Sequence, residues 1–278
     1  MEAPRSGSRE STSASESVHK SDSRRQGFRF VGVDLLRGLA IVMMVAYHFC
    51  YDLAHFGFAS WQPDDMLIDW PWVAWRSSIV ASFLLLVGFS RAMNAAFKPS
   101  SSDFWVRWAQ IAVGATLVSV ASHGFAGDRW IYFGILHFVA VAILICRLVL
   151  FRVQSVLWIA TVGGIALVAG LLFSTPALDS TPLNILGFVA HKPPTEDYVP
   201  LFPWIGVVFI GLAGGLLWRS QDFASVTALS RLRAVIPLPI QRALAGMGRW
   251  SLSIYLVHQP VLMGVLALVA SAVRSPAH

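Results

Sequence analysis

One apolar stretch near the N-terminus carries charges that a membrane-spanning helix rarely tolerates. Residues 31–53, VGVDLLRGLAIVMMVAYHFCYDL, are apolar enough to cross a bilayer, yet they include Asp34, Arg37, His48 and Asp52. A charged group near the bilayer centre costs at least about 2.5–3.5 kcal/mol, so such residues usually pair, face a cavity or serve a function. The stretch is therefore predicted to be a membrane helix that carries a polar site.

The polar residues of this stretch share one helical stripe. Arg37, Ile41, Met44, His48 and Asp52 follow one another at steps of three or four residues, which places them on one face of a helix. Arg37 and His48 are then about 16 Å apart along the axis. Such a face presents a cation towards one membrane surface and an imidazole with a carboxylate towards the other.

Composition indicates an integral membrane protein. Of the 278 residues, 56% are hydrophobic and 13% charged, against about 25% charged residues in a soluble domain. The net charge of +6 is better explained by Lys and Arg in cytoplasmic loops than by binding to nucleic acid. Cys50 and Cys146 lie in different expected helices at different depths, and both are expected to be packing residues.

The expected fold is all-α, a polytopic transmembrane helix bundle of about seven spans. Residues 1–27 are Ser-rich and charged, which predicts a disordered cytoplasmic tail, and residues 28–274 form the transmembrane domain. Residues 184–190 are apolar but too short to cross, so we expect them at the interface or in a re-entrant turn. Each of the expected spans is near the roughly 20 residues that a crossing requires: 31–54, 72–96, 104–122, 131–151, 155–173, 201–218 and 249–272.

The basic residues alternate along these segments and predict an orientation. If the N-terminus is inside, the outer segments keep only Arg76, Arg129, Lys192 and Arg274, and the inner segments hold the other loop Lys and Arg. This is the bias that the positive-inside rule describes. We therefore predict N-in, C-out, with the first helix running outward.

In this orientation the first helix has two chemically different ends. Arg37 lies towards the inner leaflet, whereas His48 and Asp52 lie near the outer surface. A carboxylate one turn from a histidine can orient its ring and raise its basicity, as in many general bases. The alternatives are that Arg37 snorkels to the interface as an anchor and that His48 and Asp52 only close helix contacts.

Polar groups near the outer surface could share a cavity with His48. His137 lies at a similar depth in the fourth span, and a loop with Asp197, Tyr198 and Trp204 precedes the sixth. Aromatic rings beside a carboxylate would suit a sugar, which has apolar faces and hydroxyl donors. The alternatives are a histidine that only packs and aromatic anchors at the membrane interface.

The last span begins GMGRWSLSIYLVHQP and carries Ser251, His258 and Gln259. These side chains either bond neighbouring helices or line the same passage as the first helix. No sequence motif for a nucleotide-binding loop, a zinc protease or a nucleophile elbow occurs, and no Cys and His spacing supports a metal site.

The order of these motifs resembles a known family. VDLLRGLAIVMMVAYHFCYDL, FLLLVGFSR, FGILH, DYVPLFPWIGVVFIGLAGG and SLSIYLVHQP occur in an order similar to bacterial relatives of heparan-α-glucosaminide N-acetyltransferase. The spacing from Arg37 to His48 also resembles the first-helix motif of acyltransferase family three. The two groups are regarded as one superfamily of transmembrane acyl-transferring proteins.

This resemblance implies a function in the bacterial inner membrane. An acetyl group from acetyl-CoA, a co-substrate rather than a bound cofactor, would pass from the cytosol to a sugar or glycolipid acceptor outside. Arg37, with Asp34 beside it, would contact CoA, while His48 would deprotonate the acceptor and Asp52 would orient His48. CoA's pantetheine arm is long enough in principle to carry the thioester into the membrane.

The chain departs from the family at one position. In the lysosomal enzyme the histidine thought to act as base lies in an outer segment resembling residues 58–61, and the matching residue here is Phe58. His55 lies three residues earlier. We therefore rank His48 first as the base, because Arg37 and Asp52 accompany it, with His55 second and His137 third.

Two other functions fit the same residues. A transporter or flippase for a small anionic or lipid-linked substrate could use the buried charges as a relay, although no internal repeat is evident. A helical scaffold could use them only to hold the bundle together. The acceptor and the oligomeric state, with a homodimer as one option, are left open.

Overall fold

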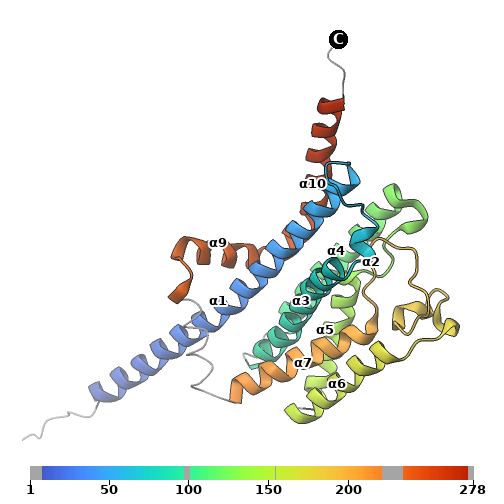
Figure 1. Cartoon of the computed structure of the whole chain (residues 1–278). Coiled ribbons are helices and arrows are strands. Elements are labelled where there is room, and N and C mark those ends of the chain that lie inside the picture. The colour runs from blue at the N-terminus through green and yellow to red at the C-terminus, as the bar shows by residue number, and fades with distance from the viewer. Residues whose placement is uncertain (1–7, 97–100, 154, 221–233, 275–278) are drawn as a thin grey trace, which may run out of the picture.

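The structure, a computed structural model, describes residues 8–96, 101–153, 155–220 and 234–274. These residues form an all-helical molecule with no β-strand among them, which confirms the predicted fold class (Figure 1). Short 3-10 turns lie at Gly127–Arg129, Pro176–Leu178 and Leu183–Leu186. The helices are α1 (Ser8–His55), α2 (Asp65–Ile68), α3 (Trp70–Ala96), α4 (Ser101–Ala126), α5 (Ile135–Arg152), α6 (Val156–Leu172), α7 (Leu201–Ser220), α9 (Leu238–Arg249) and α10 (Ser251–Arg274).

Six of these helices are long and apolar enough to cross a membrane. They are α3, α4, α5, α7, α10 and the part of α1 from Val31–His55. The remaining predicted span, α6, is a 17-residue apolar helix, which rises about 26 Å and so falls short of a hydrocarbon core of roughly 30 Å. It lies along α7 (Figure 1). The predicted fourth span also begins later, because residues 131–134 precede the first turn of α5.

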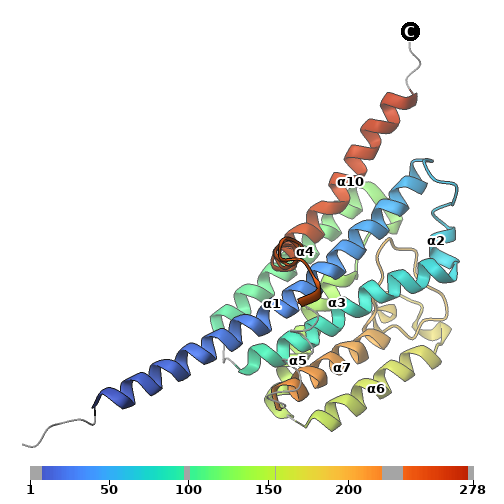
Figure 2. The same ribbon diagram turned by 60° about the vertical axis from the view of Figure 1, so that its left-hand side comes forward.

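Helix α1 includes most of the N-terminal region for which a disordered tail was expected, and that expectation stays a prediction. Residues 1–7 lie outside the described part, but α1 begins at Ser8 and continues without a break to His55. From Ser8 to Gln26 the sequence contains neither glycine nor proline, so no residue there interrupts the backbone hydrogen bonds of a helix. In Figures 1 and 2 this part of α1 extends well beyond the bundle.

The helices pack as two groups that share α3. One core is formed by α3, α5, α6 and α7, with Leu84, Phe138, Ile159 and Leu212 fully buried. The second lies between α1, α2 and α3, with Ile41 and Met66 at its centre and α10 packed against it. Figure 2 shows α1, α10 and α4 on one side of the bundle and α6 and α7 on the other. The polar stripe of α1 therefore faces protein.

Small residues bring α7 close to its neighbours. A Cβ on Gly211 would clash with the Leu85 carbonyl of α3, and one on Gly206 would clash with the Gly163 carbonyl of α6. Close backbone approach of this kind is how small residues promote helix packing in membranes. A predicted cytoplasmic loop also contains a helix that the apolar periodicity did not indicate. This helix, α9, lies against α1, where its Gly248 meets the Asp34 carbonyl and its Leu244 carbonyl meets Gly38.

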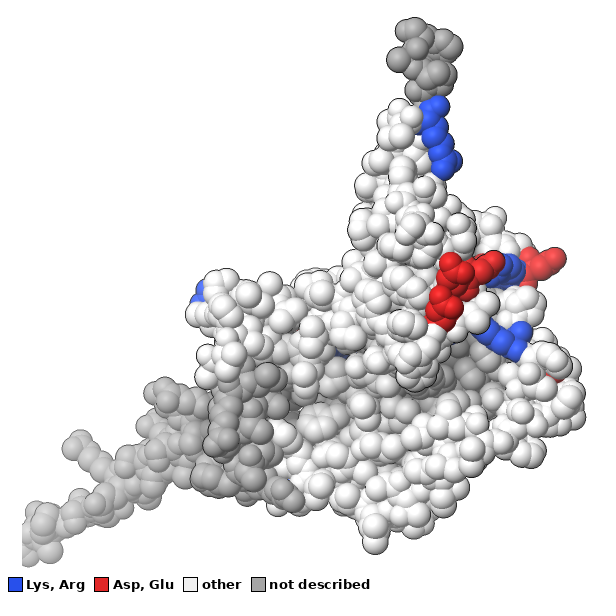
Figure 3. Space-filling view, in the orientation of Figure 1, with Lys and Arg blue, Asp and Glu red and all other residues white. Residues whose placement is uncertain are grey.

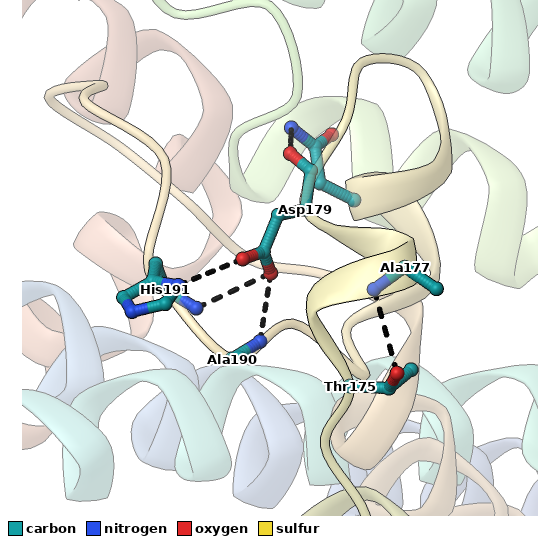
Figure 4. A network of polar contacts seen from close by, with 6 residues as sticks. Thr175, Ala177, Asp179, Ala190 and His191 are labelled. Atoms are coloured by element: carbon teal, nitrogen blue, oxygen red, sulfur yellow. Dashed lines mark hydrogen bonds and ion pairs between the residues drawn. The ribbon is translucent and has the colours of Figure 1, made fainter.

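The long connection between α6 and α7 is held by one carboxylate (Figure 4). Asp179 Oδ1 accepts from the backbone N–H of Ala190 at 2.8 Å and of His191 at 3.2 Å. Its Oδ2 lies 2.8 Å from His191 Nδ1. These contacts with His191 and Ala190 hold the pKa of Asp179 below its usual range. The placement of residues 184–190 at a membrane interface stays a prediction.

Gly248 and Gly246 of α9 provide a matched test of the α1–α9 contact. We expect Gly248→Ala to destabilise the protein by about 1–3 kcal/mol, because the new methyl group overpacks against the Asp34 carbonyl. Gly246→Ala meets no atom within 4 Å and should be neutral or stabilise by roughly 0.5–1 kcal/mol. Thermal unfolding of the purified protein measures both, and equal melting temperatures for the two variants would contradict the contact.

Asp179 gives a prediction about pH. We expect Asp179→Ala to speed amide hydrogen exchange at Ala190 and His191, because both N–H groups lose their acceptor. A carboxyl whose pKa is lowered by folding stabilises above its unfolded pKa of about 3.9. Protection in the wild type should therefore be lost as the pH falls through the still lower folded pKa. Asp128→Ala is the control, since the side chain of Asp128 has no hydrogen bond within the described residues. If Asp128→Ala sped exchange at Ala190 and His191 as much as Asp179→Ala, Asp179 would not be what holds the loop.

Candidate active site

Helices α1 and α10 bring together polar residues that lie about two hundred positions apart in the chain. The rings of His48 and His258 meet edge to face with centroids 4.9 Å apart. One turn beyond His48, Gln259 Nε2 donates a hydrogen bond of 2.8 Å to Asp52 Oδ1. The Asp52 side chain is fully buried. These four side chains form the centre of the candidate site, and all four were predicted to be functional.

Backbone carbonyls fix the protonation pattern of both histidines. His48 Nδ1 lies 3.0 Å from the carbonyl oxygen of Met44, and His258 Nδ1 lies 2.7 Å from that of Tyr255. A carbonyl oxygen can only accept, so each Nδ1 carries the hydrogen. In the neutral rings each Nε2 then has a free lone pair, which is the form that a general base requires.

The site contains buried acceptors that lack a donor. Within the part of the chain that the structure describes, His258 Nε2, Gln259 Oε1 and Asp52 Oδ2 are all buried without a hydrogen-bond partner. Leaving such a group unsatisfied costs about 1–3 kcal/mol, so a protein seldom keeps several side by side without a reason. A molecule that brings N–H or O–H donors would satisfy them.

Asp52 does not hold the His48 ring as the sequence suggested. Its Oδ1 accepts from Gln259, while the Met44 carbonyl accepts from His48. The sequence could not show this, because an (i, i−4) carbonyl competes with the side chain one turn further on, and Gln259 is distant in sequence. Asp52 instead joins α1 to α10.

The second-ranked base, His55, makes no hydrogen bond to these four side chains among the described residues. It is the last residue of α1, its side chain is exposed, and its ring packs against Phe56 with centroids 5.2 Å apart. Phe58, which occupies the position of the expected family histidine, is also exposed at 40%. Neither residue contributes a group to the His48 and His258 pair.

His137, the third-ranked base, is fully engaged in the local structure. Ser119 Oγ donates to the Ile131 carbonyl at 2.7 Å, so its oxygen accepts from His137 Nε2 at 3.0 Å. His137 Nδ1 then accepts from the backbone N–H of Gly134 at 3.3 Å. Both ring nitrogens are therefore occupied by hydrogen bonds at the start of α5. This favours the alternative that His137 only packs.

Asp197 links the loop between α6 and α7 to the histidine pair. Its Oδ2 accepts from Ile135 N–H at 2.9 Å and from the Tyr255 hydroxyl at 3.4 Å. Burial raises the pKa of the Asp197 carboxyl, although both hydrogen bonds oppose that shift. The ring of Tyr255 lies 5.8 Å from that of His258, so the polar groups continue from Asp197 to His258.

Other predicted site residues lie away from the histidines. The Tyr198 hydroxyl donates to the Asn184 carbonyl at 2.6 Å, and Trp204 packs against the α3–α7 core. Ser251 begins α10, almost two turns before His258. Tyr198 and Trp204 therefore stabilise the fold around the loop, and their role as anchors at a membrane interface stays a prediction.

Arg37 is already paired. Its Nη1 forms an ion pair of 3.0 Å with Asp34, and its Nη2 donates to Ser90 Oγ of α3 at 2.9 Å. The side chains of Arg37 and Asp34 keep 24% and 19% of their surface exposed. This group ties α1 to α3 and leaves part of the guanidinium available.

An aromatic cluster beside His48 was not predicted. Trp72 and Trp75 of α3 stack at 5.9 Å, Trp61 lies 5.6 Å from Trp72, and Tyr47 lies 5.6 Å from Trp75. The spacing of three residues between Trp72 and Trp75 was the available signal. Tyr47 and His48 meet edge to face at 5.9 Å, so this cluster forms one wall of the site.

Figure 3 shows charged side chains gathered near α2, around a hollow, whereas the rest of this face is almost uncharged. In the loops, Arg129 pairs with Glu196 at 2.9 Å. The pKa of Lys192 is lowered by burial and by the charge of Arg76. A polar molecule could approach the histidines from this end.

A different cavity of about 430 Å³ opens between α1, α3 and α7. Its walls are apolar apart from Ser82, and they include Gly214 and Trp218 of α7. No titratable side chain lines it, so we do not place the chemistry there. Within the described residues, no group of three His, Cys, Asp or Glu could hold a metal ion.

Comparison with known proteins identifies the family. The family model for heparan-alpha-glucosaminide N-acetyltransferase, catalytic, matches residues 29–260, which include both histidines, Asp52 and Gln259. No curated protein and no solved structure matches the chain. The resemblance seen in the sequence motifs is confirmed, and the six candidate spans agree with a multi-pass membrane protein. The chain therefore belongs to the heparan-alpha-glucosaminide N-acetyltransferase family of membrane acetyltransferases.

Proposed function

We propose that this protein transfers an acetyl group from cytosolic acetyl-CoA to a sugar or glycolipid acceptor on the outer side of a bacterial inner membrane. The observation that carries the proposal is the His48 and His258 pair, whose Nε2 atoms bear free lone pairs beside unsatisfied buried acceptors. Membership of an acetyltransferase family supports the reaction type.

The acceptor would bind through its own donors. A sugar amine or hydroxyl can donate to Asp52 Oδ2, Gln259 Oε1 and His258 Nε2, which lack donors. His48 Nε2 takes the proton as the acceptor's nitrogen or oxygen attacks the thioester carbonyl. The new C–N or C–O bond forms, the C–S bond breaks, and the CoA thiolate leaves and regains a proton.

The two ends of α1 would then serve the two substrates. With the N-terminus inside, as the distribution of Lys and Arg favours, Arg37 lies at the donor end and His48 at the acceptor end. The aromatic wall of Trp61, Trp72 and Trp75 suits the apolar face of a sugar ring. The hollow at the charged end would admit the acceptor (Figure 3).

Histidine substitutions test this assignment. We expect His48→Ala to lower kcat for acetyl transfer by about 10²–10⁴-fold, the usual contribution of a general base. The melting temperature should change little, because His48 donates only to a carbonyl of its own helix. Acetylation of a glucosamine acceptor by purified protein in lipid nanodiscs, with acetyl-CoA as donor, is the measurement.

His55→Ala and His123→Ala are the controls. His55 lies outside the pair, and His123 packs against Trp130 with ring centroids 5.6 Å apart, so both variants should stay within about threefold of the wild type. Transfer that persists in His48→Ala but is lost in His55→Ala would move the base to His55. Transfer that persists in both would refute a histidine base on this helix.

A further inference from the structure

Two arginines from different helices share one aromatic ring at the end of the bundle opposite the histidines. The guanidinium carbon of Arg91, on α3, lies 4.9 Å from the centroid of Phe104, and that of Arg147, on α5, lies 4.2 Å from it. Phe104 is a buried residue of α4. The two guanidinium carbons therefore cannot be further apart than these two distances combined.

These two positive charges are not neutralised within the described part of the chain. No ion pair shorter than 4.0 Å involves either residue there, and the Nε of Arg91 is buried without a hydrogen-bond partner. Arg147 has one long hydrogen bond, 3.4 Å from its Nη2 to Ser101 Oγ. By contrast, Arg37 has Asp34 and Ser90 as partners.

The aromatic contacts do not remove the need for an anion. A cation over a ring gains only about 0.5–1 kcal/mol at an exposed site, and two like charges this close repel each other. Arg147 also lies 5.9 Å from the ring of Trp105, so the rings hold the planar groups in fixed places. Among the described residues, Arg91 Nε has no hydrogen-bond partner and Arg147 has only the bond to Ser101, so donors remain for a ligand.

We infer that Arg91, Arg147 and Phe104 form a phosphate-binding clamp. Phosphate oxygens match the guanidinium fork, and their tetrahedral arrangement lets one phosphate group bind two arginines that approach from different helices. Arg91 follows Ser90, the partner of Arg37, so the clamp lies at the donor end of the proposed orientation.

Two sources of phosphate reach that end. One is the headgroup of an anionic phospholipid, since basic pockets between membrane helices on the cytoplasmic side bind such headgroups. The other is the nucleotide part of CoA, and that source alone rests on the proposed function. Both present the same chemical group to the two arginines.

Arg147 is the residue to change first, because its side chain is exposed and its loss should spare the fold. Arg152 lies five residues later on α5, is equally exposed, and makes no contact with Phe104 among the described contacts. Arg147→Gln and Arg152→Gln thus remove the same charge near the same membrane surface. Arg147→Lys keeps the charge but loses the planar fork.

The first arm measures binding of CoA and of dephospho-CoA to full-length protein in phosphatidylcholine nanodiscs. The second measures phosphatidylglycerol and phosphatidylcholine adducts by native mass spectrometry. In at least one arm we expect Arg147→Gln to weaken binding about tenfold or more, the effect of losing a charged hydrogen bond. The affinity of Arg147→Lys should lie between those of the wild type and Arg147→Gln. The affinity of Arg152→Gln should stay within about twofold of the wild type.

The arms also identify the source. A loss that affects CoA but not dephospho-CoA assigns the 3′-phosphate, and a loss that affects both assigns the diphosphate. A loss of phosphatidylglycerol adducts alone assigns a lipid. Failure of the wild type to bind or use acetyl-CoA would count against the proposed function, and the lipid arm would still decide the clamp. The clamp would be overturned if Arg147→Gln left binding unchanged in both arms. It would also be overturned if Arg152→Gln weakened binding as much as Arg147→Gln.

Discussion

The hydrogen bond between Gln259 and Asp52 is the contact on which the candidate site depends. It joins α1 to α10 at a fully buried carboxylate, where losing a hydrogen bond is costly. Because it is directional, it fixes both the height and the rotation of α10 against α1. A slip of one residue would turn α10 by about 100° and carry His258 away from His48.

This contact explains why the site keeps unsatisfied groups. Gln259 Nε2 and Asp52 Oδ1 satisfy each other, whereas Asp52 Oδ2 and Gln259 Oε1 are buried without a donor among the described residues. A scaffold that used polar groups only for cohesion would be expected to pair them more completely. The incomplete pairing therefore favours a binding site for a molecule that carries hydrogen-bond donors.

The sequence was sufficient for those features that depend on local pattern. Runs of about 20 apolar residues define the long spans, and the stripe from Arg37 to Asp52 places the polar face of α1 correctly because one helical period sets it. Contacts between residues that are distant in sequence could not be predicted from the local pattern. Asp52 was expected to hold His48, but its partner Gln259 lies on the last helix, and Met44 supplies the carbonyl instead.

Short and polar elements were also hard to predict. Helix α9 has only 12 residues and is too polar to register as a span, and its place is set by Gly248 and Gly38 against α1 rather than by its own periodicity. His137 illustrates the opposite problem. Its depth matched that of His48, yet Ser119 and Gly134 occupy both of its nitrogens, which depth alone cannot reveal.

The two ends of the bundle carry unpaired groups of opposite hydrogen-bonding character. Asp52 Oδ2, Gln259 Oε1 and His258 Nε2 are acceptors without a donor among the described residues, whereas the two guanidinium groups at Phe104 have no counter-ion there. Arg37, which bonds Ser90 next to Arg91, is already paired with Asp34, so it is a poor choice as the sole anchor for a highly charged donor. An acetyl donor with phosphates at one end and an acceptor with hydroxyl or amine groups at the other would satisfy both ends, and the acetyl group would meet the acceptor beside His48.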